Sequence, residues 1–154
     1  MAELSLDGLL SRLSQLRTET EQAVREEVET VALAAKATIE LRIVYSGKDA
    51  EGNPFKPYTE RYRKKKEDAK RFRGFVDFTF TGQLWSSIGI IEQKQDGNDW
   101  VVSLSGRDET SRAIMEGLDG DRKRWFTLSQ DEIKVLTDEA GERMVERLRV
   151  IVEQ

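Results

Sequence analysis

The sequence predicts a two-layer α+β fold in which a mainly antiparallel sheet of three to four strands packs against long N- and C-terminal helices. Apolar residues recur at helical spacing near both ends of the chain, and strand-like runs separated by turn residues lie between them. A length of 154 residues suits a single domain with its own core. We therefore expect one domain over 1–154, made of a leucine-rich N-terminal arm (1–17) and an α+β body (18–154).

The N-terminal part begins with a dense block of leucines on one helical face. These are Leu6, Leu9, Leu10, Leu13 and Leu16. Helical spacing resumes from Val24 to Ile39, after the almost wholly polar interval 17–22. The pattern allows one helix with a weakly anchored first third, or two helices. We favour a main helix over 20–44, with the leucine block packing separately. The leucines make either ordinary core contacts or contacts with a neighbouring subunit, because exposing so many of them is unfavourable.

A loop and a basic helix are expected next. Residues 47–57 contain both prolines of the chain and two glycines, which predicts a loop. A helix is expected to start at Thr59 and carries a strong excess of cations, opposed only by Glu67 and Asp68. The cations are Arg61, Arg63, Lys64, Lys65, Lys66, Lys70, Arg71 and Arg73. Three interpretations remain open: a solvated face, a docking surface for an acidic protein, or a lining that contacts the phosphates of passing DNA.

The centre of the chain predicts a small sheet. Within residues 75–80, Asp77 and Thr79 alternate with Phe78 and Phe80, a pattern typical of a half-buried strand. Thr81 is placed to cap a single helical turn that carries Leu84 and Trp85. The strand-like runs 88–92 and 100–105 flank the turn 95–99 and predict a hairpin. Together these runs give at least three strands.

The C-terminal part predicts a short helix over 111–118, an apolar plug around Trp125 and a long final helix. Ser129 and Glu132 have the spacing of a capping box at the start of that helix. One apolar face follows along it, made of Ile133, Leu136, Ala140, Met144, Leu148 and Ile151. We expect this helix to lie across the sheet.

The composition excludes most kinds of enzyme chemistry. The chain has no histidine and no cysteine, which excludes Ser-His-Asp triads, thiol nucleophiles and the common zinc sites. The net charge of −4 arises from well-mixed signs and argues against a general nucleic-acid binder. We predict no catalytic residue, no cofactor and no metal, and therefore no enzyme. No apolar run is long enough for a membrane span and no signal peptide is recognisable, so we expect synthesis in the cytosol.

Three short motifs, in their order and spacing, resemble the tail-completion, or virion-morphogenesis, proteins of tailed bacteriophages. The first is a Gly-Asn-Pro-aromatic turn followed by tyrosine, at Gly52–Tyr58. The second is a Thr-Gly-x-Leu-aromatic-x-Ser-Ile motif, at Thr81–Ile88. The third runs from Gly117 through Arg124, Trp125 and Phe126 to a Leu-Ser-x-Asp-Glu-Ile sequence at 128–133. The resemblance covers roughly residues 39–146.

This resemblance implies a structural protein of the virion neck, assembled in the host cytoplasm. It implies a homo-oligomeric ring of six or twelve copies around the DNA channel. Its partners would be the head connector or adaptor and the tail tube or terminator protein. Two alternatives stay open: a tail terminator, or a DNA-binding module that uses residues 61–73 without reading base sequence.

Overall fold

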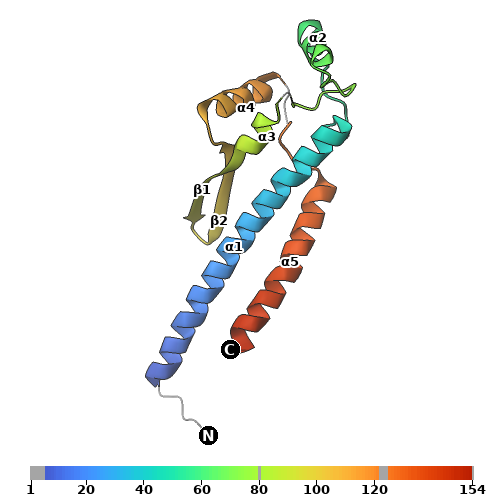
Figure 1. Cartoon of the computed structure of the whole chain (residues 1–154). Coiled ribbons are helices and arrows are strands. Elements are labelled where there is room, and N and C mark those ends of the chain that lie inside the picture. The colour runs from blue at the N-terminus through green and yellow to red at the C-terminus, as the bar shows by residue number, and fades with distance from the viewer. Residues whose placement is uncertain (1–5, 80, 122–124, 154) are drawn as a thin grey trace.

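The computed structural model describes residues 6–79, 81–121 and 125–153, and it is organised along one long helix, α1 (Leu6–Ser46) (Figure 1). The C-terminal helix α5 (Gln130–Glu153) runs antiparallel beside it. A hairpin of β1 (Ile88–Asp96) and β2 (Asp99–Gly106) lies along another side of α1. The short helices α3 (Gln83–Ser87) and α4 (Glu109–Asp121) lie near the C-terminal half of α1, and α2 (Glu60–Asp68) projects beyond its end. The fold is therefore α+β with long terminal helices.

Helix α1 is continuous, so the expectation of a separately packed leucine block before a helix over 20–44 is wrong. The alternative of one helix with a weakly anchored first third is confirmed. Side-chain pairs four residues apart span the polar interval that suggested a break. Gln15 donates to Glu19 (2.7 Å), Arg17 to Glu21 (2.9 Å) and Gln22 to Glu26 (3.0 Å). Such pairs stabilise exposed helical turns that have no apolar contacts.

The described strands form a two-stranded antiparallel sheet, so the expected sheet of three to four strands is not confirmed. The hairpin itself is where the sequence predicted it, with Ile88 opposite Gly106 and Asp96 opposite Asp99. The segment expected as a third strand is irregular over residues 75–79, and Phe80 lies outside the described residues. Val76, Asp77 and Phe78 are all buried in succession, which differs from the predicted half-buried strand, where alternate side chains face water.

The final helix begins as predicted. The backbone N–H of Ser129 donates to Glu132 Oε2 (2.7 Å), and the Glu132 N–H donates to the Ser129 hydroxyl (3.2 Å), which completes the capping box. Arg42 of α1 also donates to Glu132 and to the carbonyl of Thr127 (2.6 Å). The start of α5 is thereby attached to α1. The predicted apolar face contacts α1 rather than lying across the sheet, and only Leu136 in it is fully buried.

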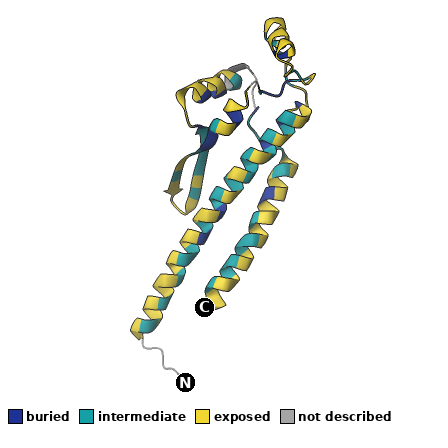
Figure 2. Cartoon of the chain, viewed as in Figure 1, coloured by how far each residue is buried: buried dark blue, intermediate teal, exposed yellow. Residues whose placement is uncertain are grey.

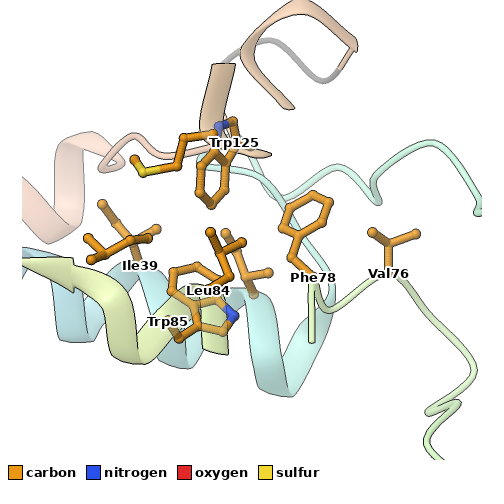
Figure 3. Close-up of a cluster of buried hydrophobic side chains, with 9 residues drawn as sticks. Ile39, Val76, Phe78, Leu84, Trp85 and Trp125 are labelled. Atoms are coloured by element: carbon orange, nitrogen blue, oxygen red, sulfur yellow. The ribbon is translucent and has the colours of Figure 1, made fainter. Parts of the chain in front are cut away.

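The buried apolar core lies at one end of the molecule, where the C-terminal half of α1 meets α3, α4 and the loops around them (Figures 2 and 3). Trp125 is completely buried at its centre and confirms the predicted plug. The Trp125 ring lies 5.5 Å from Phe78 and 5.8 Å from Trp85 between centroids, both edge-to-face. The predicted helical turn is α3, but its N-cap is Gly82 rather than the predicted Thr81. Thr81, one residue earlier, accepts a hydrogen bond at Oγ1 from the Gln83 N–H (3.3 Å).

Away from this core, polar contacts also hold α1 and α5 together. Arg143 binds the buried Glu27 at 2.8 Å, and Arg147 binds Glu26 at 3.0 Å. Near the other end of the pair, Arg12 donates to the backbone carbonyl of Ile151 (3.3 Å). The N-terminal half of α1 is mostly exposed (Figure 2). The molecule therefore has one globular end and one slender end.

We expect the change Gly47→Ala to destabilise the chain more than Gly52→Ala does. Both glycines have positive φ (64° and 84°), so both substitutions carry a left-handed backbone penalty of about 1–2 kcal/mol. A Cβ at Gly47 would also lie 2.5 Å from the Phe75 ring, whereas nothing lies within 4 Å at Gly52. Guanidinium unfolding measures the difference. Equal losses would show that the contact between Gly47 and Phe75 is unimportant.

Candidate interaction surfaces

The first candidate surface is the leucine arm, which we define as Leu6, Leu9, Leu10 and Leu13. These side chains are 72%, 45%, 55% and 54% exposed, whereas Leu16 is half-buried. For Leu6, Leu9 and Leu10 the reason is geometric: α5 reaches only to about the level of Arg12, so the first turns of α1 project past its end (Figure 1). Four large apolar side chains on one projecting helix form the kind of surface that usually contacts another molecule.

The second candidate surface is basic and surrounds α2. Seven of the eight predicted cations are exposed: Arg61, Arg63, Lys64, Lys65, Lys70, Arg71 and Arg73. Lys66 is the exception, because its side chain is fully buried. The prediction that it belongs to an interaction surface is therefore wrong. Lys66 shares a helix face with Tyr62, one turn earlier, and that face turns toward the core.

Lys66 instead anchors α2 to the core. Its ammonium group donates hydrogen bonds to the carboxylate of Asp77 and to the backbone carbonyl of Thr79. Asp77 is also fully buried, and its two oxygens accept further bonds from the Thr79 N–H (3.1 Å) and hydroxyl (2.6 Å). Arg73 adds a looser ion pair at 3.8 Å. A buried charge pair persists only when its hydrogen-bonding groups are satisfied, as they are here.

Tyr58 connects the same network to the loop before α2. Its hydroxyl donates to Asp77 Oδ1 (3.0 Å) and accepts from the backbone N–H groups of Asp77 (3.2 Å) and Phe78 (2.9 Å). Burial and the neighbouring negative charge of Asp77 raise the pKa of Tyr58 well above its usual value. Burial alone would raise the pKa of Asp77. The hydrogen bonds and charge of Lys66, with the bonds from Thr79, outweigh burial and lower it.

An apolar groove lies beside this network, between the loop before α2, α3 and α4. Two adjoining hollows of about 370 and 150 Å³ form it, and they share four lining residues: Tyr62, Phe78, Leu84 and Ile114. Tyr58 and Leu118 extend the apolar lining at one end, and Lys56 adds a positive charge. A neighbouring basic hollow meets the groove at Thr59 and Tyr62 and contains Arg61 and Lys65. The groove is thus apolar inside and cationic at one margin.

Among the described residues, no three carboxylates are grouped to hold a metal ion. The one buried carboxylate–lysine pair has its hydrogen bonds satisfied by the protein itself. No helix in the described ranges is long and apolar enough to cross a membrane.

No protein-family model matches the chain, and no curated protein or solved structure is significantly similar to it.

The sequence analysis located the leucine arm and the exposed cations but missed the anchor and the groove. Asp77 lies in the segment predicted as a half-buried strand, and the described residues of that segment form no strand. Tyr62 and Lys66 are four residues apart and therefore lie on the same face of the helix. An aromatic side chain indicates that its helix face packs against the core, so this spacing could have predicted that Lys66 is buried. Ile114 and Leu118 of α4 are also four residues apart, and this spacing could have predicted the apolar wall that α4 contributes to the groove. Arg124, part of the third motif, lies outside the described residues.

Replacing Lys66 by methionine should destabilise the chain strongly. The change removes the cation but leaves the Asp77 carboxylate buried, and breaking such a pair from one side costs about 3–5 kcal/mol. Lys64→Met is the matched control, because Lys64 is exposed on the same helix and its loss should change stability by less than about 0.5 kcal/mol. Urea unfolding followed by tryptophan fluorescence measures both variants. Similar free energies of unfolding for the Lys66→Met and Lys64→Met variants would show that the Lys66–Asp77 pair does not anchor α2.

Acid should weaken the anchor. The pKa of Asp77 is lower in the folded chain than in the unfolded chain, where an aspartate titrates near about 3.9. The stabilisation is therefore complete above about pH 4 and is lost as the pH falls through the folded-state pKa. We expect the free energy of unfolding of Asp77→Asn to fall less between pH 5 and pH 2.5 than that of the unchanged chain. An equal fall in the free energy of unfolding of the two chains over this pH range would contradict this expectation.

Proposed function

We propose that the chain is a structural protein of the bacteriophage neck, a ring-forming tail-completion subunit that joins the head connector to the tail around the DNA channel. The observation that carries the proposal is the two-ended layout. An exposed leucine arm lies at the slender end, and the groove lies at the other end, where α2 and α4 are found (Figure 1). A subunit of a closed ring needs two different contact surfaces, one for each neighbour.

The positions of the three motifs support the resemblance on which the proposal also rests. The Gly52–Tyr58 turn contributes Phe55, whose ring lies 4.8 Å from that of Phe78. The Thr81–Ile88 motif contributes Trp85, and the third motif contributes Trp125, with 5.8 Å between their ring centroids. Motifs far apart in the sequence thus meet in one aromatic core (Figure 3). Residues that build a core together are what a shared fold is expected to retain.

The exposed cations around α2 suit a surface that faces passing DNA. Four of them follow one another closely on the projecting helix: Arg61, Arg63, Lys64 and Lys65. Lysine and arginine at this density contact phosphates without selecting a base sequence, which is what a channel for a whole genome requires. A tail terminator would have the same position and the same need, and it remains the alternative role.

Deleting the gene for this chain from the phage or prophage that encodes it tests the proposal. We expect DNA-filled heads and completed tails to accumulate unjoined in electron micrographs of induced lysates. Expression of the chain from a plasmid should restore joined particles. Tails of irregular length would favour the terminator role instead. Normal, infectious particles without the chain would refute a neck function.

A further inference from the structure

We infer that the groove between α2 and α4 binds the leucine arm of a second copy of this chain. The inference rests on the proposed assembly into rings and names the two surfaces that meet there. The arm and the groove lie at opposite ends of α1, which is about 60 Å long (Figure 1). A straight, continuous helix cannot bring its own N-terminus to its C-terminal end. Docking of this arm into this groove therefore requires two chains.

The two surfaces suit each other in shape. Leu6, Leu9, Leu10 and Leu13 follow the spacing with which an amphipathic helix inserts anchors into an apolar groove. Aromatic and aliphatic side chains from three separate segments line the groove, and its smaller hollow also contains the polar side chains of Thr81, Gln83, Thr110 and Ser111. Ile114 on its α4 wall is 43% exposed, so this wall is accessible to a partner. Burial of both surfaces would remove apolar area from water on each chain.

The charges of the two surfaces also favour a second copy as the occupant. Residues 1–13, which include the arm, contain two acidic residues, Glu3 and Asp7, and one basic residue, Arg12. The groove margin contains Lys56, and the adjoining hollow contains Arg61 and Lys65. Outside segment 61–73 the chain is strongly acidic, since that segment has eight of the 25 basic residues and only two of the 29 acidic ones. One copy thus offers acidic surface to the basic end of another.

Such a contact is heterologous, because arm and groove are different surfaces. Each chain retains a free arm or a free groove until the assembly closes. This property separates the inference from arm-to-arm pairing of two leucine helices, which would join identical surfaces. It also gives the contact a direction around a ring.

Sedimentation velocity of two complementary variants tests the contact. Leu10→Asp disables the arm and leaves the groove, and Ile114→Asp disables the groove and leaves the arm. We expect each variant alone to be monomeric at concentrations where the unchanged chain associates. An equimolar mixture should form dimers and nothing larger, because it contains only one functional arm–groove pair. Leu33→Asp, an equally exposed leucine in the middle of α1, should associate like the unchanged chain.

Cysteine pairing provides a second readout that does not depend on how the aspartate variants fold. The chain has no native cysteine. A mixture of Leu10→Cys and Ile114→Cys chains should form disulfide-linked heterodimers under mild oxidation, at least tenfold faster than Leu33→Cys mixed with Ile114→Cys. Monomers from the unchanged chain at all concentrations, no dimer in the mixture, or equal disulfide rates would overturn the inference. Rapid disulfide formation between two Leu10→Cys chains would indicate arm-to-arm pairing instead.

The outcomes distinguish this inference from the proposed function. If the chain is needed to join heads to tails but the variants associate normally, the neck function stands and the arm–groove contact fails. If particles form normally without the chain but the mixture yields dimers, the contact stands and the neck function fails.

Discussion

The buried carboxylate of Asp77 is the interaction on which the globular end of the molecule depends. The carboxylate binds Lys66 of α2 and Tyr58 of the loop before α2. The backbone carbonyl of Asp77 also accepts a hydrogen bond from the Trp85 indole (3.4 Å). No strand pairing joins these segments within the described residues. A carboxylate removed from water must be paired and hydrogen-bonded, and this requirement fixes where the groups around it lie. The position of α2, and with it the basic surface, follows from that one charge.

The same carboxylate explains why the central segment could not be predicted from the sequence. Alternation of phenylalanine with Asp77 and Thr79 is typical of a strand whose polar side faces water. Here the polar side chains bind each other and Lys66 inside the protein, and Phe78 takes a left-handed backbone conformation (φ 50°). The deciding partner is eleven residues away, on a helix whose other cations are exposed. The residue pattern within 75–80 contains no information about the pairing of Asp77 with Lys66. The hairpin and the capping box depend on residues close to each other in the sequence, and both were predicted correctly.

Helix α1 illustrates a different reason for a wrong prediction. Apolar periodicity stops in the interval 17–22, and a break was inferred because tertiary packing normally stabilises a helix. Pairs such as Arg17–Glu21 and Gln22–Glu26 maintain the helix there without a core. Their i,i+4 spacing is visible in the sequence and was the better guide. The leucine block was visible in the sequence, since leucine density is a property of the sequence alone, whereas its exposure depends on where α5 ends.

Continuity of α1 also bears on how strongly the arm can bind. A disordered leucine segment would have to fold on binding, and that ordering would offset part of the interaction. The arm is already helical, because it continues a helix that is attached to α5 as far as Arg12. Each leucine that moves from water into an apolar site contributes about 1.5–3 kcal/mol when burial is complete. With its conformation fixed in advance, the arm loses less of that contribution on association. In the proposed contact between arm and groove, the preformed helix would therefore bind more tightly than a disordered segment with the same leucines.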